Sequence, residues 1–533
     1  MRPIFQKSSK LWPHVIWLAW AVGYAFCFPT YNMSFLIWII FVPVLVFAYR
    51  QPYNKTVFYS FFYSLLFWVL TLFWLMAFHE ISLPFLVPAY SLYNAFFFFC
   101  IAFIAKKLPK LRVFALPVFW VANELLRSTG YVGFQWNLIG DTQWQSLYVL
   151  QSADIWGVYG VSFLILLVNS VLAEVIHSWI ETKKLGEAIV KHRTLLIVTG
   201  AIMAANLVYG IITYHYYDDL AKKSEQAKVA LMQPNTGSFD DWWGTMWETY
   251  GKLWTLNAEA ALKDPDIIVW SETMLRNSVW FYMNQYGADA EINRFNMRFI
   301  SMPFEFDTPI LFAHPEKGTD GHNYNTVDYI DPRIPGYMTY CKIHLTPFGE
   351  WLPYYFVIPP LKTMIESLGA ASYAPAKDFV VFAGRKGKFA VMICFEDIFS
   401  ILARKFILKG VNYFLNSTND GWAYRFQIGG PFPLWQHIAG VSGVAIAVRR
   451  PIARAVNTGV SGVVMPNGSM DISPVPIYQQ GFYVADVPVI DEQIVTLYVR
   501  FGYLFPYIIA ILALAGMAYA VFGVKHEPGK ENV

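Results

Sequence analysis

The distribution of apolar residues along the chain constrains its fold more than any other feature. Long apolar windows occur at about 11–28, 34–49, 56–77, 85–105, 111–127, 155–180, 194–213 and 501–523. A helix needs about 20 apolar residues to cross the hydrocarbon core of a bilayer. The windows therefore predict an integral membrane bundle of eight transmembrane helices, of which the second and fifth are short. The low share of charged residues, 14% against about 25% in soluble domains, agrees with a membrane protein.

The basic residues favour one orientation of this bundle. An even number of spans places both termini on the same side, and lysines and arginines concentrate on that side, beginning with Arg2, Lys7 and Lys10. The short loops of the opposite side hold Arg127 and almost no other basic residue. The positive-inside rule therefore predicts cytoplasmic termini in the inner membrane of a bacterium.

This orientation divides the chain into three parts. Residues 1–221 are expected to form a membrane domain of seven helices, and 222–500 to form a periplasmic domain. The eighth helix and a cytoplasmic tail are expected in 501–533.

The polar stretch has the pattern of an α/β domain. Short apolar runs typical of strands occur at 228–233, 266–270, 389–393, 411–416 and 443–448, and a helical stretch occurs around 244–263. Strands that alternate with helices predict sheets covered by helices. About 275 residues are enough for one large core.

Three polar residues follow or lie within such runs. Glu272 follows Val269-Trp270-Ser271, Lys342 lies in Tyr340-Cys341-Lys342-Ile343, and Cys394 follows Val391-Met392-Ile393. Residues at strand ends can project into one shared cleft. A carboxylate, an ammonium group and a thiol together can supply the base, the oxyanion stabiliser and the nucleophile of a covalent catalyst.

Each of these residues also has a purely structural interpretation. A single Cys394 between apolar residues is usually a packing residue, and its thiol needs a nearby cation or base to ionise at neutral pH. Glu272 could be a carboxylate at a helix start, and Lys342 a surface lysine. The three motifs together favour catalysis. Glu350 and Glu396 could orient the lysine, act as auxiliary bases or form structural ion pairs.

Composition excludes other classes of site. The four cysteines have no paired metal-ligand spacing and no disulfide framework, so neither a metal nor another cofactor is expected. No basic cluster is interleaved with aromatic residues, so no nucleic-acid partner is expected.

The order Glu272, Lys342, Cys394 resembles the nitrilase, or carbon–nitrogen hydrolase, superfamily. Further segments look like motifs of its membrane-bound branch, the apolipoprotein N-acyltransferases; they are 120–127, 133–136, 157–163, 233–235, 347–353, 416–422, 436–437 and 454–459. The resemblance implies an αββα sandwich in the periplasmic domain, with these three residues as the catalytic triad.

The resemblance also suggests auxiliary residues. It implies that Glu350 supports the triad, that Glu396 follows the nucleophile by two positions, and that Trp242 and Trp422 belong to mobile segments near the cleft mouth. Phe395, where the family often has tyrosine, and His437 of the Gln-His pair are further candidates for loop or substrate contacts. The aromatic segments 242–243 and 351–356 suit a headgroup boundary.

The activity implied is a ping-pong acyl transfer, the last step of bacterial lipoprotein maturation. The donor would be a membrane phospholipid, the intermediate a cysteine thioester, and the acceptor the α-amine of a diacylglyceryl-cysteine apolipoprotein. The family also implies a monomer. A membrane-tethered amidase or thioesterase, in which water replaces the amine, remains an alternative, as does a non-catalytic lipid- or lipoprotein-binding protein on a degenerate scaffold.

Overall fold

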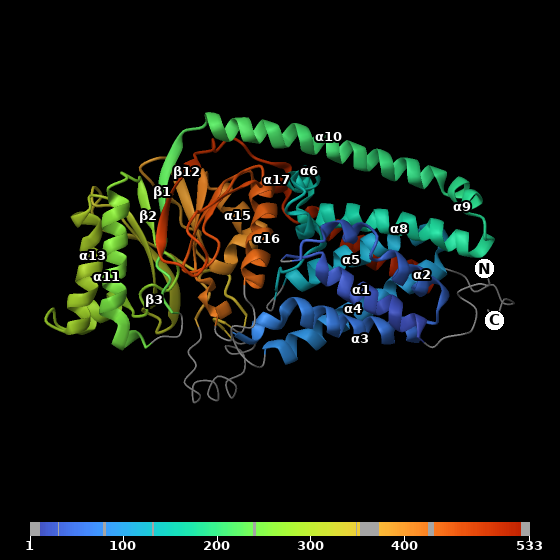
Figure 1. Cartoon of the computed structure of the whole chain (residues 1–533), viewed down its shortest axis with the longest axis horizontal. Coiled ribbons are helices and arrows are strands. Elements are labelled where there is room, and N and C mark those ends of the chain that lie inside the picture. The colour runs from blue at the N-terminus through green and yellow to red at the C-terminus, as the bar shows by residue number, and fades with distance from the viewer. Residues whose placement is uncertain are drawn as a thin grey trace.

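The computed structural model describes residues 11–29, 31–77, 82–129, 133–237, 241–347, 349–351, 373–424 and 431–523. The predictions on Arg2, Lys7 and Lys10 and on the aromatic residues 352–356 lie outside these ranges. An α/β part occupies one end of the molecule and a helical part the other, and the long helix α10 (Arg193–Lys223) runs along both (Figure 1).

Each of the eight apolar windows is helical. The helices are α1 (Trp12–Phe26), η1 (Ser34–Trp38) with α2 (Val42–Arg50), α3 (Tyr53–Leu72) with η2 (Phe73–Ala77), α4 (Ser82–Lys107), α5 (Arg112–Ser128), α8 (Val158–Thr182), α10, and α18 (Leu504–Ala518) with the π-helical turn η7 (Tyr519–Gly523). Short helices connect them: η3 (Pro109–Leu111), η4 (Ile139–Gln143), α6 (Leu147–Leu150), α7 (Ala153–Trp156), α9 (Leu185–Lys191) and α17 (Leu497–Phe501).

Five helices of the described residues are long and apolar enough to cross a membrane. They are Tyr53–Ala77, Ser82–Lys107, Val158–Thr182, Arg193–Lys223 and Leu504–Gly523. The remaining windows form shorter helices, because α1 has 15 residues, α5 has 17, and the second window is divided between η1 and α2. The structure therefore contains an apolar helical region suited to a membrane.

In the residues that the structure describes, the α/β part forms two six-stranded sheets. The first has the order β12-β1-β2-β3-β4-β5 and the second β11-β10-β9-β8-β7-β6. The strands are β1 (Gln226–Gln233), β2 (Ile267–Val269), β3 (Ile310–Lys317), β4 (Asn323–Ile330), β5 (Met338–Cys341), β6 (Phe382–Ala383), β7 (Lys388–Ile393), β8 (Tyr413–Thr418), β9 (Ile452–Val456), β10 (Gly462–Val464), β11 (Met470–Ile472) and β12 (Gly481–Pro488).

Helices cover the outer face of each sheet. Helices α11 (Trp242–Ala261) and α13 (Glu291–Glu305) lie on the first sheet, with α12 (Val279–Gln285) nearby, and α15 (Ser400–Ile407) and α16 (Phe432–Val448) lie on the second (Figure 1). Side chains of β1 alternate, so that Ala230 and Met232 pack against the helices while Val229 and Leu231 face the other sheet. This is the sandwich of two helix-covered sheets that the sequence predicted.

One of the strand predictions was wrong. Residues 443–448 form the last turns of α16 instead of a strand. A short apolar run does not distinguish a buried strand from a buried helix. Helix α16 is apolar on almost every side because it packs between the second sheet and the helical part (Figure 1).

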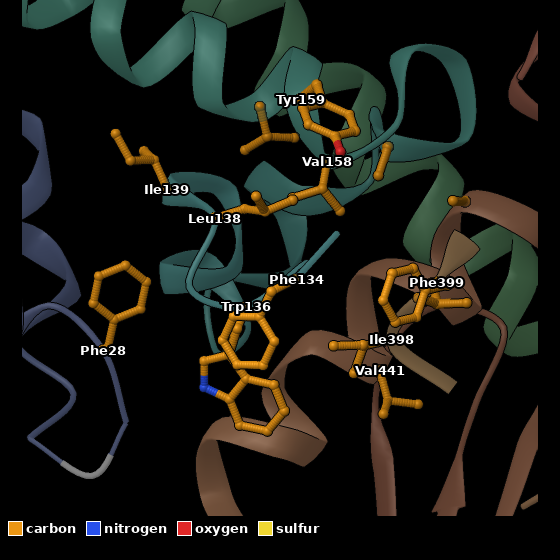
Figure 2. Packing of buried hydrophobic residues seen from close by; sticks show 14 of the residues in the cluster. Phe28, Phe134, Trp136, Leu138, Ile139, Val158, Tyr159, Ile398, Phe399 and Val441 are labelled. Atoms are coloured by element: carbon orange, nitrogen blue, oxygen red, sulfur yellow. The ribbon is translucent and has the colours of Figure 1, made fainter. Parts of the chain in front are cut away.

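The two parts share one apolar core. Figure 2 shows Phe134 and Trp136 of the helical part near Ile398 and Val441 of the α/β part, within the same buried cluster. A buried ion pair of 2.6 Å between Arg449, at the end of α16, and Asp154, in α7, joins them as well. The continuous contact fixes one edge of the α/β part against the helical region.

Candidate active site

Strand directions bring Glu272 and Lys342 to the same edge of the first sheet. Strand β2 is parallel to β3, and two antiparallel pairings lead from β3 through β4 to β5. Strands β2 and β5 therefore run in the same direction, and their carboxyl ends meet at one edge. Glu272 follows β2 and Lys342 follows β5.

Cys394 approaches this edge from the second sheet. It follows β7 directly and begins the short 3-10 helix η5 (Cys394–Ile398). The backbone N–H of Glu272 donates to the carbonyl of Thr418, at the end of the neighbouring strand β8, over 3.4 Å. The ends of the two sheets thus meet where the three predicted residues lie.

Lys342 is buried between two carboxylates. Its Nζ lies 2.7 Å from Oε2 of Glu350 and 3.5 Å from Oε1 of Glu272, and its side chain is 0% exposed. Burial alone would lower the pKa of Lys342, but the two carboxylates raise it above its usual range. Lys342 is therefore a fixed cation next to the candidate base.

Asn325, in β4, was not predicted from the sequence. Its amide donates to Oε1 of Glu272 over 2.8 Å and to Oε1 of Glu350 over 2.6 Å. The backbone N–H of Asn419 donates to the other oxygen of Glu272 over 3.1 Å. Asn325 therefore links both carboxylates that face Lys342.

Cys394 has a strained backbone. Its φ is +51°, which places a residue with a side chain in the left-handed region. The Asn416 side chain donates to the carbonyls of Met392 and Cys394 over 2.9 and 3.2 Å, and so holds this turn. A sharp turn between strand and helix projects a nucleophile away from the sheet, and strain of this kind concentrates at functional sites.

The electrostatics favour a neutral thiol next to a carboxyl group whose pKa is raised. Burial and the Glu272 carboxylate raise the pKa of Cys394 well above its usual range, whereas Lys342 opposes the shift. Burial also raises the pKa of Glu272, against the effect of Lys342. Glu272 and Cys394 therefore influence each other's pKa, and the Cys394 thiol is neutral at ordinary pH.

Glu396 connects the ends of β5 and β7. Its Oε1 accepts from the backbone N–H groups of Ile343 and His344 over 2.8 and 2.9 Å, and its Oε2 accepts from the N–H of Ile393 over 2.8 Å. The Tyr340 hydroxyl donates to the same carboxylate over 2.9 Å. Burial raises the pKa of Glu396 to about 7. These contacts fix Lys342 relative to Cys394.

A small pocket opens beside Cys394. Cys394, Phe395 and Trp422 line it together with Asp420, His437 and Thr346 of the α/β part and Trp74, Leu75, Phe134 and Trp136 of the helical part. Phe395 stacks on Phe134 with ring centroids 5.5 Å apart, and Trp422 lies 5.1 Å from Trp74. The cavity volume is about 20 Å³, which is room for about one water molecule. Four of the predicted residues, Cys394, Phe395, Trp422 and His437, therefore meet aromatic side chains of the helical part.

His437 belongs to a buried charge network in the pocket wall. Its Nε2 lies 2.9 Å from Asp397 and its Nδ1 3.1 Å from Asp420, and Arg454 forms an ion pair with Asp397. Burial would lower the pKa of His437, but the two aspartates raise it to about 9. The network joins the turn that carries Cys394 to the segment that carries Trp422.

Trp242 lies elsewhere. It begins α11 and packs on Phe295 of α13, with ring centroids 5.6 Å apart, in the helix layer over the first sheet. It does not line the pocket beside Cys394. In the described part of the chain, no cluster of histidine, cysteine, aspartate and glutamate is arranged to hold a metal ion.

Comparison with known proteins identifies both parts. Residues 20–171 match the family model of the apolipoprotein N-acyltransferase N-terminal domain, and residues 228–477 match that of carbon–nitrogen hydrolases. The chain is 25% identical to apolipoprotein N-acyltransferase 1 of Treponema denticola over 94% of this chain and 95% of that protein. It is 27% identical to the apolipoprotein N-acyltransferase of Geobacter metallireducens over 94% of both.

Among solved structures, an amidase from Nesterenkonia sp. aligns with a TM-score of 0.34 and 16% identity, over 51% of this chain and 94% of that one. The assignment rests on the sequence matches, which extend through the helical part as well as the α/β part. The chain belongs to the apolipoprotein N-acyltransferase family, in which a membrane helical region is joined to a carbon–nitrogen hydrolase domain.

Proposed function

We propose that this acyltransferase moves an acyl chain from a membrane phospholipid to the α-amine of a diacylglyceryl-cysteine apolipoprotein, through a thioester on Cys394. The observation that carries the proposal is that Glu272 and Lys342 lie next to Cys394, which itself lines a pocket whose opposite wall comes from the helical part. A hydrolase acting on water-soluble amides has no need of such a wall.

The first half-reaction forms the acyl-enzyme. Glu272 takes the proton of the Cys394 thiol as the sulfur attacks the ester carbonyl, and Lys342 stabilises the negative oxygen of the tetrahedral intermediate. The C–O bond of the ester then breaks. Glu272 returns the proton to the leaving oxygen, so the lysophospholipid departs with a free hydroxyl group and the thioester remains.

The second half-reaction uses the same residues. The neutral α-amine attacks the thioester carbonyl, a C–N bond forms and the C–S bond breaks. Glu272 takes a proton from the attacking nitrogen and transfers it to the sulfur of Cys394, so the enzyme returns to its starting state. The buried Glu272 with its raised pKa suits both steps, because it must bind a proton and release it again.

The location of the substrates accounts for the architecture. Both are anchored in a bilayer, so a pocket formed jointly by the membrane region and the α/β domain can receive both. We place eight spans in the inner membrane, with the termini in the cytoplasm and residues 222–500 in the periplasm. The helical state of every apolar window and the distribution of basic residues support this placement.

The pocket must widen for catalysis. Its volume of about 20 Å³ is far below the roughly 300 Å³ or more of pockets that bind small ligands. The Trp422 ring lies against Trp74 and forms part of the wall, so separation of these two rings is the local change that we propose for acyl-chain entry.

Product analysis with matched cysteine variants tests the proposal. Purified protein is incubated in mixed micelles with an acyl-labelled phospholipid and a diacylglyceryl-cysteine peptide. Cys394→Ala should form no amide-linked product. Cys341→Ala removes a different thiol, at the end of β5 directly before Lys342, and this variant should remain active.

Two results would overturn the proposal. One is acylation of the peptide by Cys394→Ala. The other is release of free fatty acid by the wild-type protein with the peptide unchanged, which would assign the site to an amidase or thioesterase.

A further inference from the structure

A buried hydroxyl next to the nucleophile takes no part in the scheme above. Thr418 ends β8, which runs parallel to β7 with Ser417 paired to Ile393, so Thr418 lies beside Cys394. Thr418 is 0% exposed. Its Oγ1 has no hydrogen-bond partner among the residues that the structure describes.

The surroundings of Thr418 hold it firmly in place. Its carbonyl accepts from the backbone N–H of Glu272 over 3.4 Å and from that of Asn457 over 3.1 Å. The preceding Ser417 points the other way and donates to the carbonyl of Trp270 in the first sheet over 2.8 Å. Because side chains alternate along a strand, Thr418 faces away from that contact.

An unsatisfied buried hydroxyl is unfavourable and needs an explanation. The Cys394 sulfur is the titratable group next to it, and Thr418 acts to lower the pKa of Cys394, whereas burial, Glu272 and Asp420 raise it. A neutral thiol accepts hydrogen bonds weakly, whereas a thiolate is charged and accepts them strongly. The hydroxyl therefore gains its partner when the sulfur becomes negative.

We propose that Thr418 is a further catalytic residue, whose hydroxyl donates to the Cys394 sulfur as negative charge develops on it. This inference deepens the proposed function and rests on Cys394 as its nucleophile. The sulfur carries negative charge twice in the cycle, once when it attacks the phospholipid ester and once when it leaves the thioester. Thr418 acts at both moments without gaining or losing a proton.

Thr418 supplies something that Lys342 does not. The Lys342 ammonium lies between Glu350 and Glu272 at 2.7 and 3.5 Å, so its charge is largely balanced by these carboxylates. The hydroxyl approaches from the second sheet, the same sheet that carries the nucleophile. The two donors can therefore serve the sulfur and the carbonyl oxygen separately.

Alkylation of Cys394 measures this interaction without any lipid substrate. The rate of iodoacetamide modification is followed by peptide mass spectrometry across pH, in the full-length protein in detergent. Thr418→Val keeps the shape and removes the hydroxyl. It should move the alkylation profile to higher pH and lower the rate at neutral pH by about ten- to a hundred-fold, the equivalent of one hydrogen bond to a charged group. Thr418→Ser restores a hydroxyl and should recover most of the rate.

Thr458 offers a matched control. Its hydroxyl is also buried without a partner in the described part of the chain, but it has no part in the Cys394 environment given above. Thr458→Val should leave the alkylation profile in place. If Thr418→Val does not fold, Thr418→Ala carries the same expectation.

The inference fails if the valine and alanine variants alkylate with the wild-type profile, or if valine and serine lower the rate equally. Failure of the proposed function would give a different experimental result. In that case no acyl adduct forms from phospholipid, whatever the alkylation profile of Thr418→Val.

Discussion

Replacement of Asn325 by leucine removes the donor shared by the two carboxylates around Lys342 and keeps nearly the same volume. Asn325 donates to Glu272 over 2.8 Å and to Glu350 over 2.6 Å. In Asn325→Leu, Glu272 retains the N–H of Asn419 at 3.1 Å and the Lys342 ammonium at 3.5 Å. The base therefore remains in place but loses one hydrogen bond that favours its charged form.

The size of the effect follows from that one bond. A hydrogen bond to a charged group contributes about 1.5–3 kcal/mol. One pKa unit corresponds to about 1.36 kcal/mol, so the pKa of Glu272 should rise by a further one to two units, approximately. A raised pKa means that the carboxylate form appears only at higher pH. At a fixed pH on the acid side, acyl-enzyme formation should then fall by about ten- to a hundred-fold.

The pH dependence of kcat/KM for acyl-enzyme formation tests this reasoning. The acid limb of Asn325→Leu should move upward by about one to two pH units. Asn323→Leu changes the same residue type two positions earlier in β4 and should leave the limb in place. An unshifted acid limb in Asn325→Leu would show that this amide does not control the base.

Other parts of the structure give further expectations. The pKa of His437 in the folded state, about 9, lies above its unfolded value of about 6.5, because Asp397 and Asp420 outweigh burial. The stability that protonated His437 contributes through its contacts with Asp397 and Asp420 is therefore fully present below about pH 6.5 and is lost as the pH rises through 9. The thermal stability of the protein in detergent should then fall between pH 7 and 10 more steeply in the wild type than in His437→Gln. In α10, a Cβ at Gly210 would lie 1.8 Å from a backbone carbonyl oxygen of α6, whereas one at Gly200 would meet nothing within 4 Å. Gly210→Ala should cost about 1–3 kcal/mol of stability and Gly200→Ala none, and equal melting temperatures for the two would contradict the close approach of α10.

The candidate catalytic residues could be singled out from the sequence because each follows a short run that is typical of a strand. Glu272, Lys342 and Cys394 follow β2, β5 and β7, and a polar residue at the end of a buried strand is conspicuous in sequence. Asn325 was missed because it lies inside β4, where one polar residue among several carries no signal of its own. Its role arises from the antiparallel pairing of β4 with β5, which only the fold provides.

The pocket wall was missed for a different reason. Phe134 and Trp136 lie in the family-like segment 133–136, which gave no indication of a place beside Cys394, and Trp74 lies in an apolar helix, where aromatic residues are interpreted as packing or lipid contact. Only the docking of the helical part on the second sheet brings them to Cys394. The same docking explains α16, which is buried on both sides and therefore has the apolar pattern of a strand.

The central claim is that Cys394 carries the acyl chain between donor and acceptor. The most direct measurement is peptide-resolved mass spectrometry of the purified protein after incubation with phospholipid alone, followed by a chase with a diacylglyceryl-cysteine peptide. We expect a thioester-linked acyl group on Cys394 that disappears as an amide-linked acyl group appears on the peptide. An acyl group on any other residue, or no adduct before the peptide is acylated, would contradict it.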